Sequence, residues 1–302
     1  MSDWIYQLEG TEAGHQAALL LALSAALLHA IFGSLQKGKV DPWLSRGAID
    51  TALAVMSAPM AFFLVPWPEG SQWLLMIGAM VIHFAYKLGM ALAYSRGAYT
   101  VVYPVVRGMG PFFTVIGAYF IFGEVFTLGQ WLGVLVLMGG ILGLALYNLR
   151  HIDVDRETLV PALWLAVMTG GLVALYTTYD AYAIRAMEPF TFLAWFFFLT
   201  ALDFPLLMVW RLTRMEPSKR PALGQMARIG IPGALVAYGS FGTVMLATRL
   251  DKVGEAAVLR ETSTVFAAVI GWVILKETVG PRRIALMSMI AIGAVIVEMA
   301  GK

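Results

Sequence analysis

Apolar residues fall in ten long stretches that are separated by short polar segments. A helix needs about 20 mostly apolar residues to cross a hydrocarbon layer roughly 30 Å thick, and each stretch has about that length. The apolar runs do not alternate with polar positions as the strands of a membrane β-barrel do. The pattern therefore predicts ten transmembrane helices, over residues 16–36, 47–67, 72–95, 99–122, 127–149, 159–184, 189–211, 227–249, 253–275 and 282–300.

The composition agrees with a chain that lies in a lipid bilayer. Of its 302 residues, 60% are hydrophobic and 13% are charged, whereas a soluble domain carries about 25% charged residues. The net charge of only +2 gives no reason to expect nucleic acid as a partner. The absence of cysteine excludes thiolate metal sites and thiol catalysis. The histidines and buried charges show no metal-ligand spacing, so we expect neither a metal nor a cofactor.

The basic residues between the stretches are distributed unevenly. Most of the 21 lysines and arginines follow the odd-numbered stretches. Such an excess is typical of the cytoplasmic side of a membrane. We therefore expect a multi-pass protein of the cell inner membrane with both termini on the non-cytoplasmic side.

The two halves of the chain align with each other. Residues 96–140 fall on residues 249–293 without a gap. Five spans in each half would make the two copies cross the membrane in opposite directions, and such inverted repeats are typical of secondary transporters. An old duplication without mechanistic meaning is the alternative. The alignment matches three charged pairs: Arg96 with Arg249, Arg107 with Arg260, and Glu124 with Glu277.

Two segments suggest a family. GEVFTLGQWLGVLVLMGGILGL at 123–144 and KETVGPRRIALMSMIAIGAVIV at 276–297 resemble the glutamate-plus-glycine helix ends of the drug/metabolite transporter superfamily, EamA type. Residues 93–122 are similar to the fourth helix of that family. The resemblance covers essentially the whole chain, although its motifs are diffuse.

The resemblance implies an all-α membrane protein, with ten transmembrane helices arranged as two inverted five-helix repeats around a central cavity. Residues 1–149 would be the first EamA-like repeat and residues 150–302 the second. Members of the family move small solutes by alternating access, and they include amino-acid exporters and exchangers of phosphorylated solutes. Arg107 and Arg260 depart from the usual pattern and indicate an anionic group in the ligand.

Ionisable residues inside a membrane are costly and are candidates for function. In the third stretch, His83, Tyr86 and Lys87 share one helical face. That face is predicted to line the cavity, where Lys87 could bind a carboxylate or phosphate. His83 is a candidate proton carrier, and a hydrogen-bonded packing role is its alternative.

The fourth stretch places Tyr103 and Arg107 on one face, and Arg260 is the repeat partner of Arg107. A buried guanidinium suits the binding of a carboxylate or phosphate. Ion pairs that gate the path or join helices are an equally open alternative for both arginines. Glu261 follows Arg260 in the chain, points about 100° away from it, and is expected to meet a neighbouring helix.

The sixth stretch aligns Tyr176 with Asp180. Asp180 is a candidate for a coupling proton site or for binding an ammonium group, and a salt bridge to Lys87 or Arg107 is the alternative. We count three cations inside the spans (Lys87, Arg107 and Arg260) against three anions (Asp180, Asp203 and Glu261).

The glycines at 129, 133, 139 and 143 predict close helix packing, with dimerisation as a further role. A monomer and a homodimer therefore both remain open.

The sequence thus predicts a transporter of a small polar metabolite, with a proton or counter-solute as its coupling partner. Lys87, Arg107, Tyr103, Tyr86, Tyr176 and Arg260 would bind the substrate, and Asp180, His83 and Glu261 would couple or gate its passage. An intramembrane enzyme acting on a lipid or prenyl substrate is the alternative, since it could use the same groups as acid, base and phosphate clamp.

Overall fold

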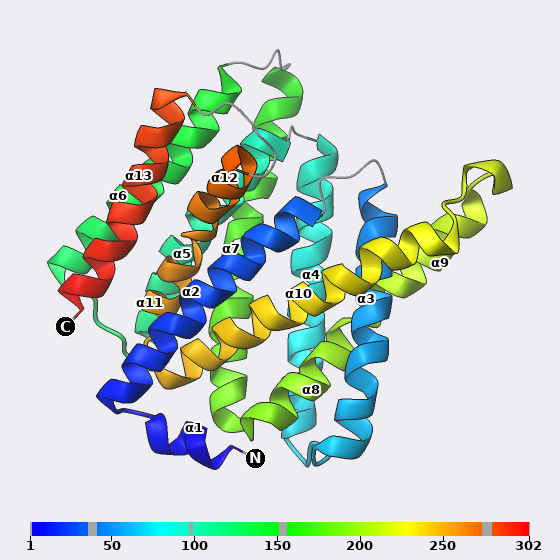
Figure 1. The fold of residues 1–302 in the computed structure, drawn as a ribbon, viewed down its shortest axis with the longest axis horizontal. Helices are drawn as coiled ribbons and strands as arrows, with labels where there is room; N and C mark the ends of the chain where they lie inside the picture. The colour runs from blue at the N-terminus through cyan, green and yellow to red at the C-terminus, as the bar shows by residue number, and fades with distance from the viewer. Residues whose placement is uncertain (1, 36–40, 97–98, 151–155, 274–279, 302) are drawn as a thin grey trace.

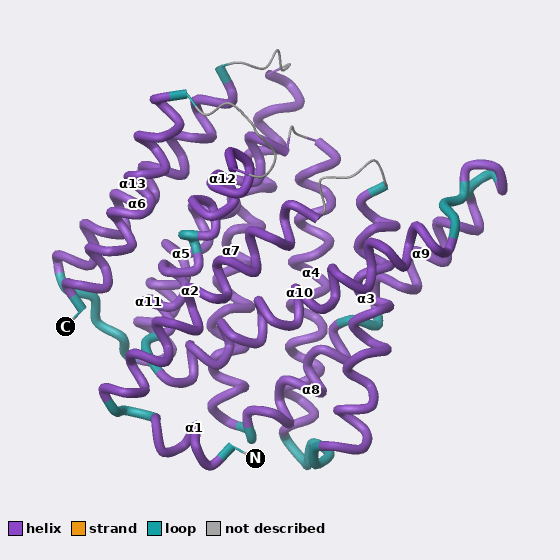
Figure 2. Tube along the Cα trace, in the orientation of Figure 1, coloured by secondary structure: helices purple, strands orange, loops and turns teal. Residues whose placement is uncertain are grey.

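The computed structural model describes residues 2–35, 41–96, 99–150, 156–273 and 280–301. Within these ranges every regular element is a helix, and the helices gather into one bundle (Figure 1). Loops in this part of the chain are short, and most lie at the ends of the bundle, although short breaks between helices also occur within it (Figure 2). The all-α membrane class that the hydrophobic pattern predicts is confirmed.

In chain order the helices are α1 (Asp3–Leu8), α2 (Glu12–Leu35), α3 (Pro42–Pro59), the π-helical turn η1 (Met60–Leu64), α4 (Gln72–Arg96), α5 (Tyr99–Phe122), α6 (Leu128–Leu149), α7 (Arg156–Ala186), α8 (Pro189–Thr200), α9 (Asp203–Arg214), the 3-10 turn η2 (Pro217–Lys219), α10 (Leu223–Leu250), α11 (Val253–Arg260), α12 (Ser263–Val273) and α13 (Pro281–Ala300).

Nine helical segments of the described residues are long and apolar enough to cross a membrane. They coincide with nine of the ten predicted stretches. The remaining stretch, residues 253–275, was expected to be one helix, and this detail is wrong, because α11 and α12 are separated at Glu261 and Thr262. The seventh stretch is also divided, into α8 and α9. The arrangement as two inverted five-helix repeats stays a prediction.

The backbone between α11 and α12 forms a tight turn with hydrogen bonds to residues three positions earlier. The N–H groups of Glu261, Thr262 and Thr264 donate to carbonyls three residues earlier, at 3.0, 3.1 and 3.0 Å. The Thr262 hydroxyl donates to the carbonyl of Leu259 at 2.7 Å, and such side-chain bonds compete with helical ones. A short stretch of this tighter geometry inside a helix often marks a hinge.

Side-chain caps fix where several helices begin. The Asp41 carboxylate accepts a hydrogen bond from the backbone N–H of Trp43 at 2.9 Å, at the start of α3. Thr127 and Gln130 form a reciprocal capping box at the start of α6. Each cap satisfies N–H groups that have no partner within the helix, so it sets the helix end that the hydrophobic pattern alone leaves open.

Helix α6 packs against α13 along a seam of glycines. A Cβ atom at Gly293 would lie 2.5 Å from the backbone nitrogen of Leu137 and 2.6 Å from the carbonyl oxygen of Gly133. A Cβ atom at Gly140 would lie 2.7 Å from the side chain of Ile290. The two backbones therefore approach as closely as residues without a side chain allow, and the helices lie side by side in Figure 1.

The seam accounts for the glycines that the sequence singled out. Close packing is therefore their role within the chain, and this face of α6 is already covered by α13. Dimerisation through the same glycines would require the two helices to separate. The four glycines 129, 133, 139 and 143 face Ala300, Gly293, Met289 and Leu286 of α13, respectively.

Gly293→Ala is expected to lower the free energy of unfolding by about 1–3 kcal/mol, because the new methyl group would meet backbone atoms that cannot move aside. Thermal unfolding in detergent measures the change. Gly171→Ala is the matched control, since nothing lies within 4 Å of its added Cβ. The control should be neutral or stabilising by up to about 1 kcal/mol, because alanine favours helix. Equal effects of the two substitutions would disprove the seam.

Candidate functional site

Buried ionisable side chains join the first half of the chain to the second inside the bundle. In the described residues, three such pairs have both members largely buried. In each pair the basic residue or histidine comes from the first half and the acid from the second. The pairs are Arg107 with Glu261, Lys87 with Asp203, and His83 with Asp180.

Arg107 of α5 forms an ion pair and a hydrogen bond with the region where α11 passes into α12. Its Nε lies 2.8 Å from Oε2 of Glu261, and the two side chains are only 6% and 1% exposed. A terminal nitrogen of the same guanidinium donates to the hydroxyl of Ser263 at 2.8 Å. The guanidinium also lies over the ring of Tyr103, 5.9 Å from its centroid. The neighbouring helix that Glu261 was expected to meet is therefore α5.

Lys87 of α4 binds both helix ends at the break between α8 and α9. Its ammonium donates to the carbonyl of Thr200 at 2.5 Å and to the Asp203 carboxylate at 2.8 Å. Thr200 ends α8, where the helix dipole favours a cation, and Asp203 begins α9, where it favours an anion. A third bond, at 2.8 Å, goes to Asp50 of α3. Lys87 is thus the centre of a polar joint between three spans.

His83 and Asp180 form a pair that aromatic rings surround. Nε2 of His83 lies 2.8 Å from Oδ2 of Asp180. The His83 ring centroid is 4.7 Å from that of Tyr176, which is in turn 4.9 Å from that of Tyr86. The two cations considered as alternative partners of Asp180 bind other carboxylates instead. The structure therefore gathers the predicted residues of α4 and α7 into one buried cluster.

Arg260 ends α11, and its surroundings differ from those of its repeat partner. It is 4% exposed. A terminal nitrogen donates one long bond, 3.4 Å, to the Tyr176 hydroxyl, and the guanidinium lies 6.0 Å from the centre of that ring. Its Nε has no hydrogen-bond partner in the described residues. The positive charges of Arg107 and Arg260 are both close enough to His29 and Tyr86 to interact with them through Coulomb forces. The two arginines, His29 and Tyr86 therefore lie in one region of the interior.

The predicted balance of three buried cations and three buried anions is incomplete. Asp50 of α3 is 0% exposed, and it also pairs with Arg46, whose Nε lies 2.9 Å from Oδ1. Asp50 falls inside a predicted span and stands four residues after Arg46, a spacing at which opposite charges meet on a helix. That spacing was the available signal. Because Asp50 and Asp203 both accept a hydrogen bond from Lys87, this lysine has one partner in its own half of the chain and one in the other half.

At the end of the bundle that holds the N-terminus, Glu124 caps α11. Its carboxylate accepts hydrogen bonds from the backbone N–H groups of Val253 at 2.7 Å and Gly254 at 3.0 Å. Burial raises the pKa of Glu124 above its ordinary value, while the two backbone donors act against that rise. Its aligned partner Glu277 lies outside the described residues.

Arg249 closes the same end. It donates to Glu9, which follows α1, at 2.5 Å, and to the carbonyl oxygens of Ile184 and Met187. The short helix α1 and the contacts of Glu9 could not be read from the hydrophobic pattern.

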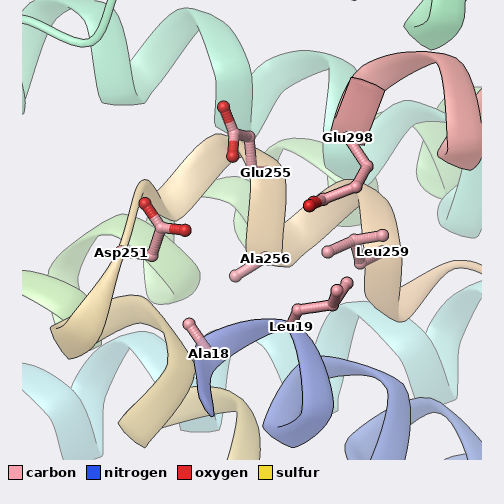
Figure 3. A pocket seen from close by; sticks show the side chains of 7 residues that line it. All are labelled: Ala18, Leu19, Asp251, Glu255, Ala256, Leu259 and Glu298. Carbon is pink, nitrogen blue, oxygen red and sulfur yellow. The ribbon is translucent and has the colours of Figure 1, made fainter. Parts of the chain in front are cut away.

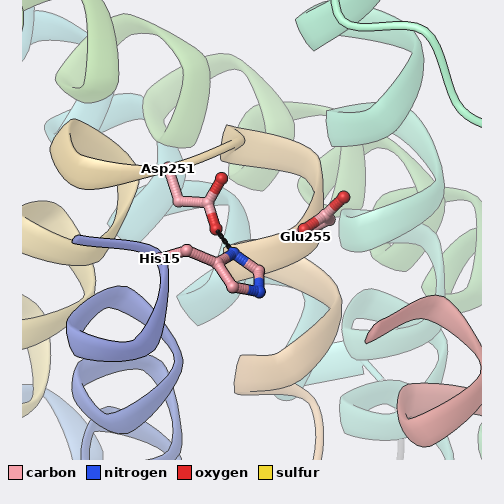
Figure 4. A group of neighbouring side chains, drawn as sticks. All are labelled: His15, Asp251 and Glu255. Atoms are coloured by element: carbon pink, nitrogen blue, oxygen red, sulfur yellow. Dashed lines mark hydrogen bonds and ion pairs between the residues drawn. The ribbon is translucent and has the colours of Figure 1, made fainter. Parts of the chain in front are cut away.

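A second polar cluster lies nearby, around a small pocket lined by Asp251, Glu255 and Glu298 (Figure 3). His15 of α2 contacts Asp251 and lies beside Glu255 (Figure 4). Ligand atoms of these three residues lie within 4.8 Å of one another, as a metal site would require. Protein donors already serve the carboxylates, since Glu255 accepts from Gln130 at 2.6 Å and from Lys252 at 2.9 Å. The cluster is therefore accounted for as a set of helix-end contacts.

Residues 160–299 match the family model of the EamA-like transporter family. The match confirms the resemblance seen in the sequence for these residues. The matched region contains Asp180, Asp203, Arg260 and Glu261, and the first half of the chain supplies the partners of the three acids.

The fold recurs in a solved crystal structure of another protein, whose description states no function. The two chains share 19% sequence identity, and the match covers 93% of this chain and 98% of the other with a TM-score of 0.73. At that identity the likeness shows the fold alone. No curated protein matches this chain at a significant level.

Arg107→Met and Glu261→Met are each expected to lower the free energy of unfolding by about 3–5 kcal/mol, because each leaves an opposite charge buried without its partner. The double variant removes both charges and should recover most of the loss. A double-mutant cycle on thermal unfolding measures the coupling.

The exposed pair Lys219–Glu216, with side chains 70% and 67% exposed, is the matched control. Its coupling should stay below about 1 kcal/mol. Additive losses at Arg107 and Glu261 would contradict the pairing.

Proposed function

We propose that the protein is a secondary transporter that carries a small polar metabolite, such as an amino acid or an organic anion, by alternating access. The match to the EamA-like transporter family and the all-helical membrane fold support transport in general. The observation that carries the finer proposal is that three of the four largely buried pairs take one member from each half of the described chain, whereas the fourth, Lys87 with Asp50, lies within the first half.

In this arrangement, movement of the two halves relative to each other would change the distances within the buried ion pairs. If the two halves rock against each other, the buried pairs between them must lengthen or break. An unpaired charge in a medium of low dielectric constant is strongly unfavourable. The halves can therefore move at low cost only when another charge, from the solute or a proton, replaces the lost partner. Such replacement would couple transport to solute binding in an exporter or exchanger.

The roles follow from the contacts. Lys87, Arg107 and Glu261 are proposed to hold the closed arrangement, and His83 with Asp180 is proposed as the coupling pair. Arg260 faces the aromatic cluster and is proposed to bind the solute. The rings proposed to line the path are those of Tyr86, Tyr103 and Tyr176.

The placement in the membrane is also part of the proposal. Both termini lie toward the same end of the bundle (Figure 1), which is consistent with an even number of crossings. The excess of basic residues at the opposite end supports a non-cytoplasmic position for the termini in the cell inner membrane.

Solute counterflow into proteoliposomes tests the proposal, with labelled amino acids, organic acids and phosphorylated sugars offered in turn. We expect at least one class to exchange chemically unchanged. Lys87→Gln and Asp180→Asn should each slow that exchange at least about tenfold, which corresponds to about 1.4 kcal/mol in a barrier.

Lys219→Gln is the control, because Lys219 lies in the exposed turn η2 and its side chain is 70% exposed. Normal exchange by both buried variants would refute the charge-replacement cycle. Conversion of an offered lipid or prenyl compound into a product, without solute exchange, would favour the intramembrane enzyme.

A further inference from the structure

The two arginines that the sequence alignment equates are not equivalent in their partners. Arg107 is followed in the chain by a glycine, whereas Arg260 is followed by Glu261. Glu261 points away from Arg260 and pairs with Arg107, 2.8 Å away. The Glu261 carboxylate therefore neutralises Arg107 of the first half instead of its neighbour Arg260. Arg260 forms no ion pair among the described residues.

Arg260 is a buried cation whose hydrogen-bonding capacity is largely unused. A guanidinium has five N–H donors, yet the described contacts of Arg260 are one bond of 3.4 Å to the Tyr176 hydroxyl and a loose contact with that ring. Its Nε is buried and has no hydrogen-bond partner among the described residues, and unlike the Nε of Arg107, which lies 2.8 Å from Glu261, it forms no ion pair there. Buried charges in proteins are ordinarily paired, so this position is incomplete as it stands.

The two nearby carboxylates form their ion pairs with other groups. Oδ2 of Asp180 contacts His83 and Oε2 of Glu261 contacts Arg107, and neither carboxylate forms an ion pair with Arg260 among the described residues. Oδ1 of Asp180 is buried and has no hydrogen-bond partner there. Further polar atoms without partners occur beside these residues. The hydroxyl of Thr264, four residues after Arg260, and that of Thr177, beside Tyr176, have no partner among the described residues.

We propose that Arg260 binds a carboxylate or phosphate group of the transported solute, and that Arg107 does not. The proposal rests on the transport function above and names the class of solute as a small organic or inorganic anion. The forked donors of Arg260 bind two oxygen atoms of that group. Arg107, held by Glu261 and Ser263, keeps the two halves together and leaves Arg260 as the site that the solute completes.

Stability separates the two arginines without any transport measurement. Arg260→Met removes a buried charge that has no ion-pair partner among the described residues, and it should raise the melting temperature of the purified protein by a few degrees. Arg107→Met has the same chemistry but leaves Glu261 unpaired, and it should lower the melting temperature. A lower melting temperature for both variants would show that Arg260 is already neutralised within the protein, and would overturn the proposal.

Anion binding is tested on the purified full-length protein through thermal stabilisation by lactate, by inorganic phosphate, and by lactamide as the neutral analogue of lactate. We expect lactate or phosphate to stabilise the wild type and lactamide to have no effect. Which of the two anions stabilises more identifies carboxylate or phosphate as the preferred group. Arg260→Met should weaken that binding at least about tenfold. Lys219→Gln is the control, because this lysine is 70% exposed in the turn η2, and it should bind the anion as the wild type does.

Counterflow with the same three probes then separates the failure of the proposed transport function from the failure of the proposed anion site. Exchange of lactamide with no exchange or binding of either anion would leave a transporter standing and overturn the anion site. Anion binding that Arg260→Met abolishes, without exchange of any probe, would retain the anion site and contradict transport. Unchanged anion binding by Arg260→Met would overturn the assignment of Arg260.

Discussion

The structure depends on one constraint, which is that charge inside a membrane must be neutralised by other charge. The chain meets this constraint mainly between its halves. The bases of α4 and α5 find their acids at the helix breaks of the region that matches the EamA-like family, at Asp203 and Glu261. The halves are therefore held together by electrostatics in the interior and by a glycine seam between α6 and α13 at one side. In the proposed transport cycle the first kind of contact changes when a charged ligand arrives, whereas the second does not.

The two breaks lie where these charges meet. Lys87 bonds both the carbonyl that ends α8 and the carboxylate that begins α9. Arg107 bonds Glu261 in the gap between α11 and α12, and Ser263 at the start of α12. A broken helix exposes backbone groups that a continuous helix would satisfy internally. Lys87 thus neutralises an acid and also satisfies a helix-end carbonyl, whereas Arg107 contacts only side chains at its break, where the backbone bonds to itself.

Much of this could be predicted from the sequence, because span length and helical faces are local properties. Most helix starts and ends lie within a few residues of those expected, and His83 and Lys87 are buried with Tyr86 half-buried beside them. That this face lines a cavity stays a prediction. The ion-pair partners of the buried residues were harder to predict, because they depend on how helices that are distant in the sequence are oriented toward one another. The pairing of Asp180 with His83 could be found only from the positions of α4 and α7 in space. The break at Glu261 has no proline or glycine to announce it, and Asp50 was overlooked although its spacing from Arg46 was visible.

The pairing of Arg107 with Glu261 also has a consequence for how the protein is made. Lys87 meets its partner Asp50 as soon as α4 enters the bilayer, because α3 has already been synthesised. Arg107 enters the membrane with α5, whereas Glu261 is translated only after four further spans (α6, α7, α8 with α9, and α10) and α11. The first half alone therefore lacks the carboxylate that pairs with Arg107 in the folded chain, and this buried charge acquires its partner only when the second half has been made.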